Sequence, residues 1–130
     1  MKYLLDTDTC IAAMRARESA VIKLSSLAPD DCGVSTVTAY ELSVGVAKCR
    51  EPSREAAKVT RFLASVQVLP LDAESARRAG LLRAALEKQG RAIGPYDVLI
   101  AGQALAHGFK LVTGNLAEFS RVEGLQVEGW

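Results

Sequence analysis

The segment Tyr3-Leu4-Leu5-Asp6-Thr7-Asp8-Thr9 decides how the chain is interpreted. An apolar run over residues 2–5 ends at a carboxylate, which predicts a short buried strand with Asp6 at its carboxyl end. The Thr-Asp-Thr residues that follow are all good helix N-caps, so a helix is expected soon after the strand. A strand that runs directly into a helix favours an α/β fold.

The same alternation of strand and helix continues outward from this segment. Gly94-Pro95 is a typical helix start and His107-Gly108 a typical helix end. The pattern predicts one mostly parallel central sheet with helices on both faces, a three-layer α/β sandwich with the first strand in the centre. Strands are expected at 33–35, 66–71, 110–112 and 126–128, and helices at 10–16, 18–27, 37–48, 53–66, 73–89 and 95–107.

Composition fits one domain over residues 1–130. The chain is 49% hydrophobic and 24% charged, which is ordinary for a globular protein. No apolar run reaches the roughly 18 residues that a membrane helix needs. The short apolar run before Asp6 is also too short for a secretory signal, so we expect a cytoplasmic protein.

Cysteine and histidine are too few for several kinds of site. The three cysteines, Cys10, Cys32 and Cys49, are widely spaced, and His107 is the one histidine. This pattern excludes a disulfide scaffold and a zinc site with the usual ligands. Any catalytic chemistry must therefore rest on carboxylates.

Two polar residues are expected at strand ends. Asp6 follows the first strand; its alternative role is a helix N-cap, although Asp8 or Thr9 stands closer to the expected helix start. Asn115 follows the strand at 110–112, where Gly-Asn is also strong turn chemistry. Since ligand sites in α/β folds lie at the carboxyl ends of strands, these residues and the nearby Glu118 are candidates.

Two more carboxylates are expected on apolar helix faces. Glu41 shares a stripe with Val37 and Val44, and a buried glutamate is costly unless it is paired or bound to a cation. The alternative is an ion pair with an arginine at the edge of the stripe. Asp97 lies in a first helical turn, where it would stabilise the helix N-terminus. Its facing neighbours are nevertheless apolar: Ile100, Ala101, Ala104 and Leu105.

Convergence of these carboxylates would require a cation between them, because like charges repel strongly at low dielectric. Oxygen ligands without histidine or cysteine select Mg²⁺ or Mn²⁺. Such ions suit hydrolysis of phosphodiesters, since they activate water and neutralise developing negative charge.

Four segments resemble, in order and at the usual spacing, the motifs of PIN-domain ribonucleases, most closely the VapC-type toxins of bacterial and archaeal toxin–antitoxin pairs. They are Leu4–Asp8, Thr38–Gly45, Ile93–Ala101 and Leu111–Phe119. The resemblance implies a PIN-like sandwich, a homodimer, Mg²⁺ or Mn²⁺, and an endoribonuclease of a type II system. It also implies a small VapB-type antitoxin whose C-terminal tail occupies the active-site groove.

The resemblance also assigns residues. Asp6, Glu41 and Asp97 match the catalytic and metal-binding acidic core, with Glu41 able to act through a water. Asn115 falls where many members have a fourth aspartate, and Glu118 is a substitute there. Thr7 and Thr113, beside the acids, would hydrogen-bond a water or a phosphate.

Basic residues gather in segments 48–61 and 77–91. These segments are either solvated helix faces or, as the resemblance to PIN-domain ribonucleases implies, surfaces that contact an RNA backbone. We expect a homodimer through helices 18–27 and 37–66, and a heterotetramer or larger with antitoxin. The apolar residues that suggest it are Ala57, Phe62, Leu63 and Val66.

Three other functions stay open. Asp6-Thr7-Asp8 is similar to the nucleophile motif of haloacid-dehalogenase-like phosphatases, although Cys10 stands where that motif has Thr or Val. A receiver-like signalling module would use Asp72 as its phosphate acceptor, a residue better explained as an N-cap. A PIN-fold subunit that only binds protein, with weak or no catalysis, is compatible with Asn115.

Overall fold

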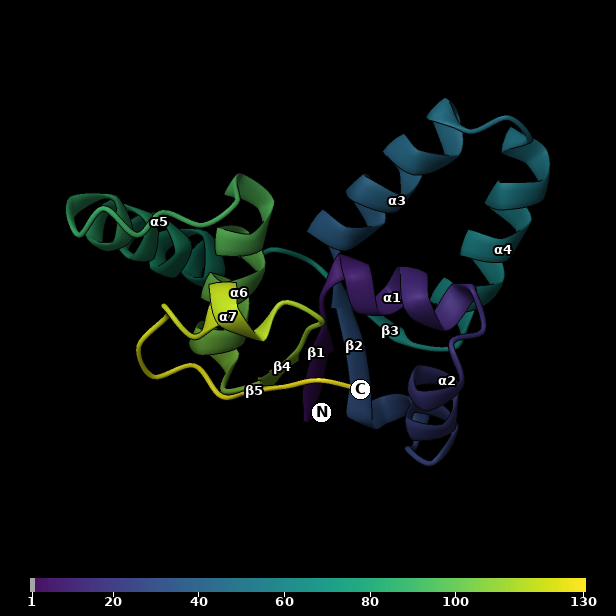
Figure 1. Ribbon diagram of the computed structural model, residues 1–130, viewed down its shortest axis with the longest axis horizontal. Helices are drawn as coiled ribbons and strands as arrows, with labels where there is room; N and C mark the ends of the chain where they lie inside the picture. Colours follow the sequence, from purple (N-terminus) through teal and green to yellow (C-terminus); the bar gives the residue numbers. More distant parts are fainter. Residues whose placement is uncertain (1) are drawn as a thin grey trace.

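The computed structural model describes residues 2–130, and its centre is a parallel sheet (Figure 1). Five strands lie in the order β3-β2-β1-β4-β5, with every neighbouring pair parallel. The predicted central position of the first strand is confirmed. The strands are β1 (Tyr3–Leu5), β2 (Cys32–Ser35), β3 (Gln67–Leu69), β4 (Lys110–Val112) and β5 (Val127–Glu128).

Helices connect these strands much as the sequence predicts. They are α1 (Thr7–Met14), α2 (Glu18–Ser25), α3 (Thr36–Lys48), α4 (Pro52–Ala64), α5 (Ala73–Lys88), α6 (Pro95–His107) and α7 (Leu116–Phe119), with a 3-10 turn η1 (Pro29–Asp31). Helix α6 has the predicted ends. Helix α1 begins at Thr7 rather than at residue 10, because Asp6 itself caps it. Within residues 2–130, no helix combines the length and the apolar character that crossing a membrane requires.

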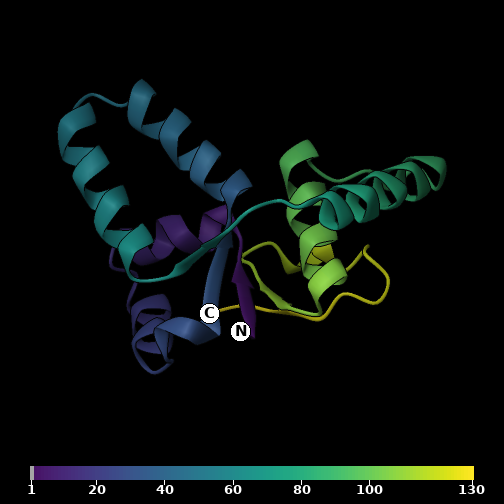
Figure 2. The ribbon, with the colours of Figure 1, turned by 180° about the vertical axis from the view of Figure 1, so that it is seen from behind.

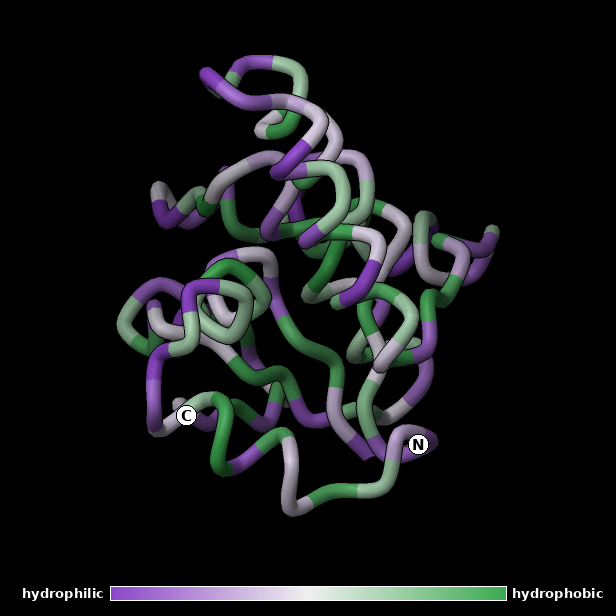
Figure 3. Tube along the Cα trace, turned by 90° about the vertical axis from the view of Figure 1, so that its right-hand side faces the viewer, coloured by the Kyte–Doolittle hydropathy of each residue, from purple (hydrophilic) through white to green (hydrophobic). Residues whose placement is uncertain are grey.

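Alternation along the strands builds two cores, one on each face of the sheet. Leu5 points into a core with Val34 and Val112, which α1 and α4 cover. Leu4 points the other way, into a core with Ile100 and Leu111 beneath α5, α6 and α7. The predicted layers are therefore confirmed (Figures 1 and 2). In the side view of Figure 3, hydrophobic stretches of the chain run through the interior of the molecule.

Most of the apolar residues that suggested a dimer interface pack within their own chain. Phe62 and Val66 are buried and Leu63 packs against the same cluster, whereas Ala57 is exposed on α4. Phe62, Leu63 and Val66 therefore do not support the predicted interface through residues 37–66. The homodimer itself stays a prediction.

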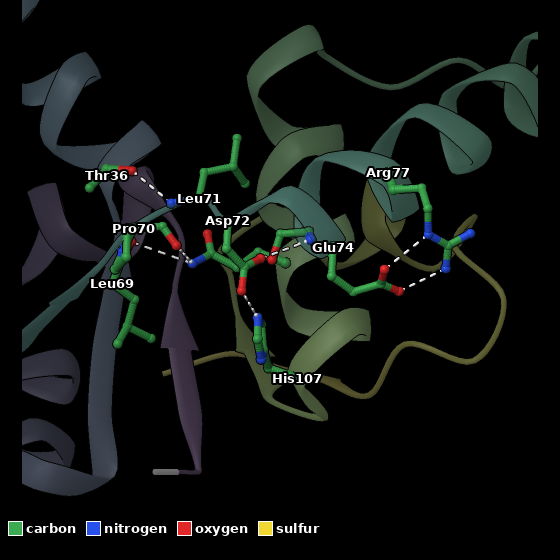
Figure 4. Close-up of polar contacts among 10 residues, drawn as sticks. Thr36, Leu69, Pro70, Leu71, Asp72, Glu74, Arg77 and His107 are labelled. Carbon is green, nitrogen blue, oxygen red and sulfur yellow. Dashed lines mark hydrogen bonds and ion pairs between the residues drawn. The ribbon is translucent and has the colours of Figure 1, made fainter.

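Residues 69–72 cross from the edge strand β3 to α5 and join the two halves of the molecule (Figure 4). The Leu71 amide donates to Thr36 Oγ1 at 3.0 Å. The buried Gln103 amide donates to the Pro70 carbonyl at 3.2 Å. Asp72 caps α5 as predicted and lies 2.8 Å from His107 Nε2, and hydrogen bonds to Ser75 and His107 hold its pKa below the usual range. This network fixes α5 and α6 relative to the sheet.

Candidate active site

Asp6 lies at the carboxyl end of β1 and is only 2% exposed. Its amide donates to the Val112 carbonyl at 2.9 Å, which joins it to β4. Its Oδ1 accepts the Thr9 amide at 2.9 Å, so Asp6 is the N-cap of α1. The expectation that Asp8 or Thr9 would cap this helix is wrong, because the helix starts directly after the strand. Burial raises the pKa of Asp6, and hydrogen bonds from Thr113 and Thr9 partly oppose that rise.

Glu41 projects from α3, the helix that follows β2, to Thr7, the residue after Asp6. Its Oε1 accepts the Thr7 hydroxyl at 2.6 Å, and Thr7 also hydrogen-bonds Thr38 at 3.1 Å. Thr7 therefore holds a candidate carboxylate, whereas the family resemblance suggested contact with water or phosphate. The predicted stripe with Val44 is wrong in its outer part, because α3 extends beyond the sheet and leaves Val44 exposed (Figure 1).

Asp97 and Glu118 face each other on the opposite side of the site. Asp97 stands in the first turn of α6, whose Ile100, Ala101 and Ala104 are buried as predicted. Burial, a hydrogen bond with Glu118 and the charges of other carboxylates raise the pKa of Asp97 to about 7. The charges that act on it belong to Glu118, Asp6 and Glu41.

Asn115 lies beside Asp97 and Glu118 and has a structural role. It caps α7, accepting the Glu118 amide at 3.3 Å and donating from Nδ2 to Glu118 Oε2 at 2.6 Å. The other Glu118 oxygen accepts the Gly94 amide at 2.9 Å. Asn115 therefore orients Glu118, the residue proposed as its substitute. Its own amide donates to Thr113, which links it to the strand end.

Sequence reasoning missed two residues of this site. Thr38 is fully buried and connects Thr7 to α3. The sequence signal that could have identified Thr38 is its position: it is a polar residue about one turn before Glu41, on the inward face of the same helix. Gly94 positions Glu118 through its backbone, for which side-chain chemistry gives no signal. A Cβ at Gly94 would lie 3.1 Å from Asp97 Oδ2, so glycine suits this close approach.

The donor set suits a hard divalent cation in an open site. In the part of the chain that the structure describes, no three His, Cys, Asp or Glu side chains form a compact metal-binding group. Burial and the neighbouring Glu118 nevertheless raise the pKa of Asp97, and the charges of Asp6 and Glu41 add to that rise. Mg²⁺ commonly keeps several waters and uses only one or two carboxylates, so this looser arrangement fits it.

The basic segments lie on exposed helix surfaces, and some of their charges are paired within a helix. Arg77 pairs with Glu74 at 2.7 Å and Arg83 with Glu87 at 2.6 Å. Exposed intrahelical pairs contribute little stability and rearrange easily. Among residues 2–130, basic side chains without a carboxylate within 4.0 Å include Arg50, Arg61, Arg78, Lys88 and Arg91.

Comparison with known proteins identifies the class to which this fold and site belong. The model of the PIN domain family matches residues 3–125, so the chain belongs to the PIN-domain family. Within that family its relatives are VapC proteins. The chain is 38% identical over 130 residues to the tRNA(fMet)-specific endonuclease VapC of Shigella flexneri, covering 100% of this chain and 98% of the relative. It is 35% identical to Ribonuclease VapC2 of Haemophilus influenzae, with the same coverage.

Solved structures agree with this placement. DNA-bound VapBC from Salmonella typhimurium matches with a TM-score of 0.94 at 36% identity, covering 100% of this chain and 98% of that chain. VapBC2 from Rickettsia felis, bound to a DNA fragment from its promoter, matches with a TM-score of 0.93 at 33% identity, covering 100% and 99%. The PIN-like fold predicted from the sequence is confirmed.

Proposed function

We propose that this protein is a metal-dependent endoribonuclease, the toxin of a type II toxin–antitoxin pair. The observation that carries the proposal is that hydrogen bonds place Asp6, Glu41 and Glu118 around Asp97, whose pKa is raised to about 7 by burial first and then by Glu118, Asp6 and Glu41. The relatives are an endonuclease specific for a tRNA and a ribonuclease, which supports RNA as the substrate. The tRNA named for the Shigella relative makes initiator tRNA the first substrate to test.

Asp6 and Asp97 would hold Mg²⁺ or Mn²⁺ directly, with Glu41 contributing through a water and Glu118 or Asn115 from the side of α7. Such an ion would supply an activated water and neutralise charge on the phosphate. The remaining work belongs to the chain. Thr9 and Thr113 orient Asp6, Thr7 orients Glu41, and Gly94 with Asn115 orients Glu118.

The antitoxin would occupy a cleft of about 290 Å³ that α1, α3 and α4 form beside Glu41. Its walls combine apolar side chains such as Leu42 and Val46 with charged ones, and since Lys58 already pairs with Glu55 and Arg15 lies elsewhere in the lining, Glu41 is the carboxylate left for a partner. A partner segment with apolar side chains and an arginine would match it, since guanidinium binds carboxylates bidentately. The matched structures are VapBC complexes, which supports such a partner. Homodimerisation is part of this proposal, and sedimentation at several concentrations tests it.

The test is cleavage of initiator tRNA and of bulk RNA by purified protein, with Mg²⁺ or with excess EDTA. We expect cleavage with Mg²⁺ and none with EDTA. Asp6→Asn should lower the rate by roughly 10²-fold or more, as expected for loss of a positioned electrostatic group. Asp8→Asn, an exposed carboxylate in the same turn, is the matched control and should cleave normally.

Three outcomes would contradict the proposal. Cleavage that persists in EDTA would rule out the proposed dependence on a metal ion. Absence of cleavage together with tight antitoxin binding would support the alternative of a protein-binding subunit. Inhibition of a phosphatase activity by vanadate would favour an aspartyl nucleophile.

A further inference from the structure

Two tyrosines stand immediately before two of the site carboxylates. Tyr40 precedes Glu41 in α3, and Tyr96 precedes Asp97 in α6. Their rings meet between the helices, with centroids 5.3 Å apart and planes tilted by 58°. Their hydroxyls are 3.0 Å apart and share a hydrogen bond. The pair therefore bridges α3 and α6 beside the carboxylates.

The exposure of this pair sets it apart from the other aromatic residues. Tyr40 is 51% exposed and Tyr96 is 40% exposed. The other aromatic side chains are buried or half-buried: Tyr3, Phe62, Phe109, Phe119 and Trp130. Rings left in water forgo much of the stabilisation that aromatic burial provides, so core packing does not account for this pair.

The pair is also a weak candidate for holding the two helices together. Val37 of α3 and Ile100 and Ala101 of α6 already join one buried cluster. A solvent-exposed hydrogen bond between neutral hydroxyls adds little to that apolar contact.

We propose that Tyr40 and Tyr96 form a platform on which an unstacked base of the RNA substrate stacks, next to the phosphodiester that is cut. The inference rests on the proposed ribonuclease function. Aromatic faces bind any base, and single-stranded or looped RNA offers splayed bases for such contacts. The platform is a positioning and specificity device, since holding one base decides which neighbouring phosphodiester meets the carboxylates.

The first measurement is binding without cleavage. A short single-stranded RNA carrying 2-aminopurine, whose fluorescence falls on stacking, is titrated with the full-length protein in EDTA. Tyr40→Leu and Tyr96→Leu should each weaken binding by about tenfold and abolish the quench. The phenylalanine variants keep the rings and should bind like the parent. Tyr3→Leu, at the other end of β1, is the matched control and should leave RNA binding unchanged.

The second measurement separates stacking from a structural role. Removing the base beside the cut from the RNA should raise KM for the parent protein, with a smaller effect on kcat. The leucine variants already lack the stacking contact, so the abasic RNA should raise their KM little further. Two changes that remove the same interaction are not additive. Melting temperatures of all variants accompany these assays.

Several results would overturn the platform. If the leucine variants bind and quench like the parent while the parent cleaves RNA, the platform is wrong and the ribonuclease stands. If abasic RNA still raises KM in the leucine variants, or only antitoxin binding is lost, the pair serves another purpose. If the parent cleaves no RNA, the proposed function fails, and the platform fails with it.

Discussion

The two sides of the candidate site hold their carboxylates in different ways. On the side of β1 and α3, Asp6 accepts hydrogen bonds from Thr9 and Thr113, and Glu41 accepts one from Thr7. On the side of α6 and α7, Asp97 faces Glu118, and its pKa rises to about 7. On the first side donors serve both carboxylates. On the second side the Gly94 and Asn115 donors serve Glu118, while Asp97 faces that like charge, which a proton or a cation relieves.

Asp97→Asn should have the largest effect, because it removes the repulsion together with a proposed metal ligand. We expect cleavage in Mg²⁺ to fall by roughly 10²-fold or more. The melting temperature in EDTA should rise, since Glu118 then faces a neutral amide. If Asp97 only stabilises the N-terminus of α6, the variant would instead lose about 0.3–1 kcal/mol and stay active. Parallel melting and cleavage assays distinguish these outcomes.

Gly102→Ala should disturb the α6 side without touching the donors of Asp6. A Cβ at Gly102 would lie 2.6 Å from the Ala79 backbone, because α5 and α6 pack very closely there. We expect the free energy of unfolding to fall by about 1–3 kcal/mol, measured by urea denaturation. Gly80→Ala in α5 is the matched control, since its Cβ would meet nothing within 4 Å. That variant should be slightly more stable; equal effects at both positions would contradict the close packing.

The pH dependence of stability in EDTA should reveal the raised pKa of Asp97 on the side of α6 and α7. Asp97 has a pKa of about 7 when folded against an ordinary value of 3.8, so the unfolded chain releases this proton first. Between those values, stability contributed by this group falls as pH rises, and it is constant above about 7. The difference in melting temperature between Asp97→Asn and the parent should therefore widen from pH 4 to pH 7. A constant difference would show that Asp97 is not strained.

The smallest effects are expected at Asn115. Asn115→Ala removes the cap of α7 and should cost about 1 kcal/mol in thermal unfolding. Asn115→Asp keeps a capping oxygen but replaces the amide that donates to Glu118 with a further charge. It should lower the melting temperature slightly in EDTA and strengthen Mg²⁺ binding, measured by calorimetry. Unchanged Mg²⁺ affinity would place Asn115 outside the metal site.

Sequence patterns predicted the layers well because the deciding signals are local. The apolar run before Asp6, the Gly94-Pro95 start and the Gly108 end of α6 (left-handed, φ 71°) each depend on neighbouring residues only. The outer half of α3 was less predictable. Val44 obeys the helical stripe but lies beyond the reach of the sheet, and periodicity carries no information on where a core ends.

The candidate carboxylates were found because each stands where an unpaired charge is costly. Their hydrogen-bond partners were harder to assign. Thr7 and Glu41 are distant in sequence, as are Gly94 and Glu118, so only the folded chain brings them within hydrogen-bond distance. The role of Asn115 as an orienting cap depends on the one-turn helix α7, whose contacts the sequence does not indicate.

The central place of β1 also sets when the site can be completed during synthesis. Leu5 pairs with Val34 on one side and with Val112 on the other. The Val112 carbonyl and the Thr113 hydroxyl, which surround Asp6, are synthesised long after it. At translation rates of about 5–20 residues per second, a nascent chain carries Asp6 for several seconds before these partners exist. Strand order therefore delays completion of the surroundings of Asp6 until β4 has been synthesised.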